Sequence, residues 1–185
     1  MIRESNAKVT TTTTIKEVVE GEKRTTETTV SNVVETFKVD LTETKEEKCK
    51  FVLIKIKKEE EGVEKIETIF VSRNKNYHSE IVSEVLSKIA GKEIGAKDDI
   101  MFDGRYLKKY IGIENSGINY NIAVCGGGFV SLSEEEKTIS ISGESCGYGK
   151  RDWSGNRRMF QTLRKAIPDY KVFSDVNEKE FYNVD

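Results

Sequence analysis

The sequence is poor in the residue types on which many active sites and small scaffolds depend. It contains one histidine and three cysteines in 185 residues. A single histidine, His78, excludes mechanisms that need two imidazoles and most histidine-rich metal sites. The cysteines, Cys49, Cys125 and Cys146, form no C-x-x-C pair and are odd in number, so they predict neither a zinc ribbon nor a disulfide framework. We expect reduced thiols in a cytosolic protein.

Long apolar runs and an excess of one charge are also lacking. No apolar run approaches the ~20 residues that a membrane span needs, and the first residues, "MIRESNAKV", lack the apolar region of a secretory signal. Lys and Arg total 30 against 32 acidic residues, a formal charge of -2. Nothing in this balance favours nucleic acid or an anionic membrane as a partner. We expect a soluble, cytoplasmic protein and a monomer.

The first 35 residues have no aromatic side chain and are rich in Thr, Val, Glu and Lys. Low aromatic content favours disorder, whereas β-branched Thr and Val favour extended structure. Two alternatives therefore stay open for this segment. It is either flexible or appended to a sheet edge, or it forms a two-stranded hairpin between residues 8 and 35 that turns at "EGEK".

The next part of the chain has clearer periodicity. The apolar run "KFVLIKIK", residues 50–57, predicts a core strand, and "IETIFVS", residues 66–72, predicts its hairpin partner. "YHSEIVSEVLSKIAG" then has apolar residues at helical spacing and a glycine as a C-terminal stop. His78 is therefore expected at or just before the start of a helix.

The second half continues this mixture of strands and a helix. Residues 92–117 have no clear period and stay unplaced. "INYNIAVCGGG" predicts a strand, "FVSLSEEEKTISISG" a hairpin, "NRRMFQTLRKAIPDY" a helix and "YKVFSDV" a closing strand. The expected fold is a single α+β (α/β-like) domain, with a mixed β-sheet flanked by two main helices.

Glycines are concentrated in "CGGGFV" and "ISGESCGYGK". In "SCGYGK", Gly147 and Gly149 would let the backbone approach an anion, Ser145 offers a hydroxyl and Lys150 a positive charge, which is the composition of a phosphate-binding loop. The sequence matches neither the Walker pattern nor the dinucleotide fingerprint. From the residues alone a simple turn explains the second stretch, and a bulge or strand end explains the first.

Other simple explanations apply to the remaining candidates. A lone histidine at a helix start is often a cap or a surface residue, and a lysine beside an apolar strand usually extends into water. Cys146 does not fit a cysteine phosphatase, because "GYGK" follows it where that chemistry needs an arginine-bearing loop. Tyr77 and Tyr148 are expected to be packing residues with one polar end.

Taken in order, the segments "KFVLIKI", "NYHSEI", "CGGGFV", "SCGYG" and "PDYKV" resemble the Janus/Ocnus family, which includes protein histidine phosphatases. The resemblance covers about residues 46–175. It implies a Thr-rich N-terminal extension at 1–45, a phosphatase-like domain at 46–176 with an insertion near 92–117, and a C-terminal tail at 177–185. It also implies a reaction without metal or cofactor that removes phosphate from phosphohistidine-containing proteins, with phospholysine as a further possible substrate.

The resemblance also implies roles for individual residues. His78, in the "YH" pair, corresponds to the family's active-site histidine, as general base or as phosphoryl acceptor. Phosphate would be held by the loop Ser145, Cys146, Gly147, Tyr148 and Gly149 and by Lys50, with further contacts from Gly127, Gly128 and Lys150.

One position departs from the family pattern. Phe129 follows the triple glycine where an arginine is common in the family, so a cation that would hold phosphate is missing. Lys150 or Arg151 would have to replace it, or affinity and specificity differ, or activity is lost. A non-catalytic reader of phosphate or phosphohistidine, or a regulatory protein of the same fold, is therefore the alternative function.

Overall fold

The structure, a computed structural model, describes residues 1–20, 23–44, 48–95, 101–102, 106–107, 110–145, 148 and 153–176. The strands are β1 (Ile2–Glu4), β2 (Lys8–Glu20), β3 (Lys23–Asp40), β4 (Cys49–Glu60), β5 (Val63–Arg73), β6 (Met101–Phe102), β7 (Tyr106–Leu107), β8 (Tyr110–Asn115), β9 (Ile118–Ser133), β10 (Thr138–Ser142) and β11 (Lys171–Ser174). The helices are α1 (His78–Ala90) and α2 (Trp153–Ala166).

Nine of these strands form one mixed sheet in the order β1-β3-β5-β4-β9-β10-β11, with β2 paired to β3 and β8 to β9. The pairs β3/β5 and β10/β11 are parallel, and the other pairs are antiparallel. The hairpins β4/β5 and β9/β10 lie where the apolar runs at 50–57 and 66–72 and the segment "FVSLSEEEKTISISG" predict them. β6 and β7 pair separately.

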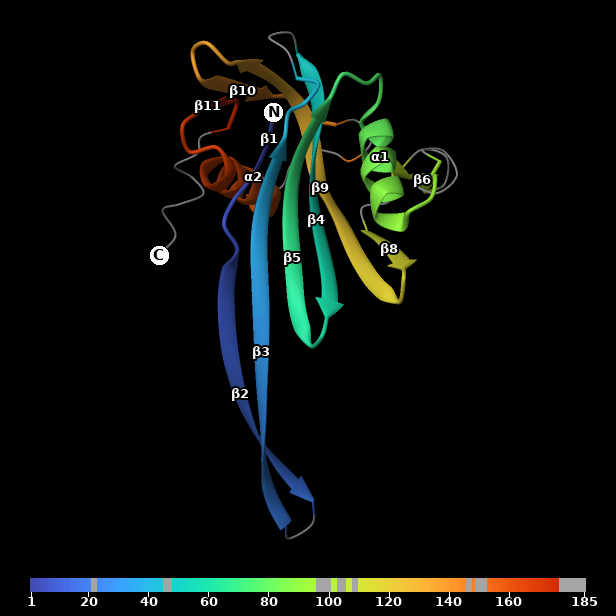
Figure 1. Cartoon of the computed structure of the whole chain (residues 1–185), viewed down its shortest axis with the longest axis vertical. Helices are drawn as coiled ribbons and strands as arrows, with labels where there is room; N and C mark the ends of the chain where they lie inside the picture. The colour runs from blue at the N-terminus through green and yellow to red at the C-terminus, as the bar shows by residue number, and fades with distance from the viewer. Residues whose placement is uncertain are drawn as a thin grey trace.

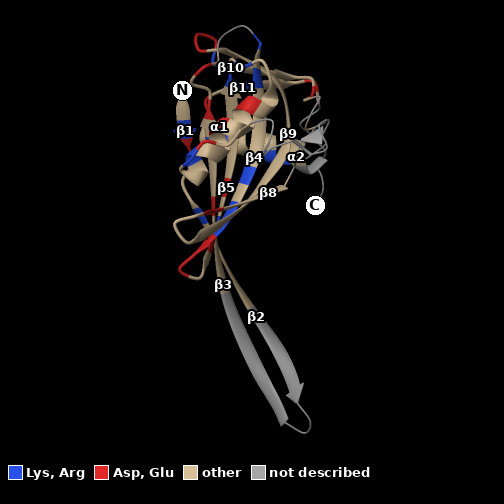
Figure 2. Cartoon of the chain, turned by 90° about the vertical axis from the view of Figure 1, so that its right-hand side faces the viewer, with Lys and Arg blue, Asp and Glu red and all other residues tan. Residues whose placement is uncertain are grey.

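The sheet buries apolar side chains on both faces, and each face is covered by one helix (Figure 1). On one face α2 packs through Met159, Phe160 and Leu163 against a core that includes Phe51 and Val130. On the other face α1 packs through Ile81, Val82, Val85 and Leu86 against Val52, Ile54 and Val124. Basic and acidic positions are interspersed over the strands and α1 on this second side (Figure 2).

The expectation of an α+β sheet flanked by two helices is wrong in its balance, because the protein is mostly β and its sheet curls into a half-barrel. Five strands, β2, β3, β4, β5 and β9, have 11 to 18 residues each, whereas the two helices have 13 and 14. The error has a physical source. The Thr-rich segment and part of residues 92–117, which the sequence analysis left open or unplaced, both add strands to the sheet.

The Thr-rich segment forms the hairpin β2/β3, whose strands pair in register from Lys8↔Glu35 to Glu20↔Lys23. β5 covers β3 only from residue 32 onward, so residues 23–31 pair with β2 alone and the ribbon projects beyond the body (Figure 1). The other end of β3 belongs to the core, where Phe37, Val39 and Leu41 are buried. These three residues precede the boundary at 45/46 that the sequence suggests.

A β-bulge in β9 changes which side chains face α1. Between the pairs Val52↔Gly127 and Ile54↔Val124, β9 has one residue more than β4. Val124 and Val130 are six residues apart and would share a face in a regular strand, yet Val124 packs under α1 and Val130 under α2. The bulge at residues 125–126 therefore turns Gly127 and Phe129 toward the start of α1.

Neither helix in the described part of the chain combines the length and the apolar character that crossing a membrane requires.

Candidate functional site

His78 is the first residue of α1, and its side chain is directed into the protein. The helix start is fixed by Glu80, whose carboxylate accepts a hydrogen bond from the Tyr77 backbone N–H at 2.8 Å. His78 is 8% exposed, whereas Tyr77 beside it is 68% exposed. The histidine is thus neither the helix cap nor a surface residue, which were the simpler explanations for its position.

The imidazole is oriented by a backbone carbonyl of the bulged strand. Nε2 of His78 lies 2.9 Å from the carbonyl oxygen of Gly128. A carbonyl oxygen can only accept, so Nε2 carries the hydrogen, and in the neutral ring Nδ1 carries the free lone pair. Burial lowers the pKa of His78, the hydrogen bond to Gly128 opposes this effect, and the positive charge of Lys50 lowers the pKa further. The neutral ring is therefore favoured near neutral pH.

Gly127 allows the histidine to lie directly against the sheet. A Cβ atom at this position would lie 2.5 Å from the Phe51 carbonyl oxygen, 3.1 Å from Cδ2 of His78 and 3.4 Å from Cβ of Ser145. The first distance is impossible for a real Cβ contact, so no other residue fits without a shift of the backbone. Gly127 thus brings His78 and Ser145, which are far apart in sequence, to one point.

Of the expected phosphate loop, the structure describes Ser145 and Tyr148. Ser145 is 1% exposed, and its hydroxyl oxygen accepts a hydrogen bond from the Tyr148 backbone N–H at 3.2 Å, which leaves the hydroxyl hydrogen available to a ligand. Tyr148 is fully buried in the core under α1, and burial raises the pKa of its phenol. Cys146, Gly147, Gly149, Lys150 and Arg151 lie outside the described residues.

Lys50 approaches His78 from the neighbouring strand. It pairs with Phe129 across β4 and β9, and its Nζ lies 5.6 Å from the centre of the Phe129 ring. The same ring meets His78 edge-on, with centroids 6.0 Å apart and an interplanar angle of 70°. The position that lacks the family's arginine is therefore occupied by an aromatic ring that touches both candidate site residues.

A buried charge cluster beside the site was missed by the sequence analysis. Arg73, at the end of β5, is 5% exposed at its side chain and contacts Asp40 at 2.7 Å and Glu84 of α1 at 3.1 Å. It thereby joins β3, β5 and the helix that carries His78. The one signal in the sequence is an arginine that directly follows a buried apolar strand and precedes a helix.

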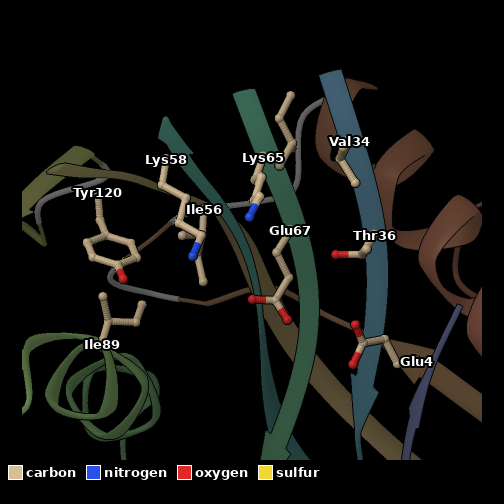
Figure 3. A pocket seen from close by; sticks show the side chains of 10 residues that line it. Glu4, Val34, Thr36, Ile56, Lys58, Lys65, Glu67, Ile89 and Tyr120 are labelled. Carbon is tan, nitrogen blue, oxygen red and sulfur yellow. The ribbon is translucent and has the colours of Figure 1, made fainter. Parts of the chain in front are cut away.

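A cavity of about 290 Å³ lies at the other end of α1, away from His78 (Figure 3). Carboxylates of Glu4 and Glu67, the Thr36 hydroxyl and the Tyr120 ring project toward it, with Ile89 of α1 at its side. Burial raises the pKa of Glu67. None of the expected site residues that the structure describes lines this cavity, so it is separate from His78, Lys50 and Ser145. Among the described residues no group of three or more His, Cys, Asp or Glu side chains is placed to hold a metal ion.

The fold and site define a class: a mostly β domain in which a single histidine at a helix start is set against a glycine-rich, bulged strand, next to a buried serine and a lysine. A family model for the Janus/Ocnus family matches residues 36–171, and the chain belongs to that family. No match was found among curated protein sequences. The matched range begins within β3, so the whole β2/β3 ribbon, residues 8–35, precedes it.

Proposed function

We propose that this protein is a metal-independent phosphatase that hydrolyses the P–N bond of phosphohistidine in proteins, with phospholysine as a further possible substrate. The observation that carries the proposal is the orientation of His78. Its Nε2 hydrogen bond to Gly128 leaves Nδ1 free to take a proton or a phosphoryl group. Membership of the Janus/Ocnus family supports the same reaction type.

The reaction needs few groups, because a phosphoramidate bond breaks easily once its nitrogen is protonated. In one route Nδ1 of His78 takes a proton from water as the water oxygen attacks phosphorus, the P–N bond breaks, and the leaving imidazole nitrogen takes up a proton. In the other route Nδ1 itself forms a bond to phosphorus as the substrate imidazole leaves, and water then hydrolyses the phosphorylated His78. Both routes give inorganic phosphate and an unphosphorylated histidine side chain in the substrate protein.

The surrounding groups suit charge stabilisation. The ammonium group of Lys50 and the hydroxyl of Ser145 would face the equatorial phosphoryl oxygens, where negative charge is spread in the transition state. The low pKa of His78 keeps Nδ1 unprotonated near neutral pH, as either role requires. Removing a donor of this kind costs about 100- to 1000-fold in rate, so we expect such a loss for Ser145→Ala.

A non-catalytic phosphate or phosphohistidine reader is the second candidate, and Phe129 favours it. With an aromatic ring in place of the family's arginine, Lys50 is the cation that the described residues place beside His78. A site with less positive charge holds a phosphoryl group less tightly and stabilises its transition state less.

The deciding experiment is phosphate release from a phosphohistidine-containing protein by the purified chain, with EDTA present. His78→Ala should abolish release, while circular dichroism shows that the variant is folded. Binding of inorganic phosphate to both proteins is measured in parallel. A His78→Ala variant with the rate of the unmodified protein would refute the catalytic assignment, and phosphate binding without release by the unmodified protein would establish the reader.

A further inference from the structure

Phe129 has an unusual number of contacts with the site for a residue that carries no polar group. The bulge in β9 turns it toward α1, and strand pairing places it directly opposite Lys50. Its ring face lies 5.6 Å from Nζ of Lys50, and its edge meets the His78 ring at a centroid distance of 6.0 Å. One ring therefore bridges the lysine and the histidine.

Gly143, which follows β10, lies close to the same ring. A Cβ atom at Gly143 would lie 3.0 Å from Cδ2 and 3.4 Å from Cε2 of Phe129, so a larger residue would press on the ring. The backbone at Gly143 has φ +68°, which also favours glycine, and its N–H donates to Asp175 at 2.7 Å. The ring thus lies close to Gly143 as well as to the two site residues.

We propose that Phe129 is a positioning residue that holds the ammonium group of Lys50 beside His78 through its ring face. A lysine side chain has several rotatable bonds and would otherwise extend into solvent. An ammonium ion over an aromatic face is attracted by the ring's negative charge distribution, which restrains it without adding a competing charge. The ring therefore does not replace the family's cation; it fixes a lysine that is already present.

The pKa of His78 depends on how close the ammonium group of Lys50 lies. Burial is the main cause of its lowered pKa, the Gly128 carbonyl acts in the opposite direction, and Lys50 lowers the pKa further. Of the other charged groups that the structure describes near the start of α1, Arg73 pairs with Asp40 and Glu84, the Glu80 carboxylate accepts from the Tyr77 N–H, and Lys75 lies in the exposed loop before the helix. If the ammonium group moves away, the pKa of His78 must rise toward its ordinary value.

The test is an NMR titration of the imidazole, and because His78 is the single histidine of the chain its signal needs no assignment. Phe129→Leu keeps apolar bulk and removes the ring. We expect the pKa of His78 to rise in Phe129→Leu and in Lys50→Met, and to stay low in Phe129→Tyr. In the double variant Phe129→Leu/Lys50→Met the pKa should rise no further than in Lys50→Met alone. Phe173→Leu, at an exposed ring on β11, serves as the control and should leave the titration unchanged.

Two results would overturn the inference. One is a Phe129→Leu protein that titrates as the unmodified protein does while Lys50→Met raises the pKa. The other is a shift from Phe129→Leu that adds in full to the shift from Lys50→Met, because the ring would then act through burial of His78 and not through the lysine.

The catalytic consequence rests on the proposed phosphatase function and is measured separately. Loss of the cation–π contact should lower kcat/KM for phosphohistidine about two- to five-fold, with Phe129→Tyr retaining most of the rate. Absence of phosphate release from every protein would refute the proposed function, while the titration would still decide the role of Phe129.

Discussion

Replacing Gly127 by alanine tests whether the site depends on direct contact between the bulged strand and the start of α1. The added methyl carbon would lie 2.5 Å from the carbonyl oxygen of Phe51, where ordinary contacts begin near 3.4 Å. This carbonyl belongs to β4, which is paired on both sides in the middle of the sheet, so it cannot turn away cheaply. The strands must separate locally instead.

The expected cost follows from this crowding. Adding a methyl group to a closely packed position typically destabilises a protein by about 1 to 3 kcal/mol. Alanine gains up to about 1 kcal/mol over glycine through the unfolded chain, which reduces but does not cancel the loss. The methyl group would also lie 3.1 Å from Cδ2 of His78, so the imidazole must shift from the Gly128 carbonyl that orients it.

Gly112 supplies a matched control, because it lies on strand β8 with no atom within 4 Å of its added Cβ and without a positive φ. Urea unfolding followed by circular dichroism should show Gly127→Ala less stable by about 1 to 3 kcal/mol and Gly112→Ala unchanged or more stable by up to about 1 kcal/mol. Equal stabilities of the two variants would refute the reasoning about close approach.

Two further changes test one half-buried and one buried polar group. Burial is the main cause of the raised pKa of Glu67, Glu4 raises it further, and Lys38 and Lys58 oppose the rise. The ionised carboxylate therefore destabilises the folded state, and stability is lost as pH rises through the folded pKa. Glu67→Gln should raise Tm at pH 7 and make little difference near pH 4, and a lower Tm at pH 7 would contradict this. The hydroxyl of Tyr148 is buried and has no hydrogen-bond partner among the residues that the structure describes. Tyr148→Phe should therefore be neutral or stabilising by about 1 kcal/mol in urea unfolding, and a large loss would show that the hydroxyl has a partner.

Individual elements were predictable because their signals are local. The apolar run of β4 and the helical spacing in α1 identify both elements, and Gly91, with φ +65°, ends α1 where the sequence places its stop. The core face of α2 was also visible in the spacing of Met159, Phe160 and Leu163, all of which are buried. In each case neighbouring residues carry the pattern, so no knowledge of the tertiary structure was needed.

The balance of the fold was not predictable in the same way. A run of threonines suits both an extended strand and a solvated chain. The parallel pairing of β3 with β5, which attaches the hairpin to the sheet, depends on residues far apart in sequence. The same holds for the site. The register shift between Val52 and Ile54 decides that Gly127 and Phe129 face the start of α1, and no local sequence pattern predicts it. The sequence shows that Phe129 stands where the family pattern has an arginine, but it does not show that the Phe129 ring contacts Lys50.

The buried cluster around Arg73 gives a last prediction. The pH dependence of stability should distinguish the contribution of this cluster from that of surface charges. Burial alone would raise the pKa of Asp40, but hydrogen bonds from Arg73 and Thr42 outweigh it and hold the pKa below its ordinary value. A lowered pKa means that ionised Asp40 stabilises the fold above the unfolded-state value near ~4, and that this stability is lost as pH falls through the folded value.

Asp40→Asn should therefore destabilise the protein at pH 7 by about 2 kcal/mol, the scale of a hydrogen bond to a charged group, because Arg73 keeps its contact with Glu84. The difference from the unmodified protein should shrink below about pH 4, where the aspartate of the unfolded chain becomes protonated, and should continue to shrink as pH falls through the lower pKa of folded Asp40. Glu64→Gln is the control, since Glu64 pairs with Lys57 at an exposed position and such pairs contribute little. If Asp40→Asn costs no more than Glu64→Gln at pH 7, or if its cost is the same at pH 3, Arg73 does not hold β3, β5 and α1 together by charge. The placement of His78 would then depend on the apolar packing of α1 and on the hydrogen bond to Gly128.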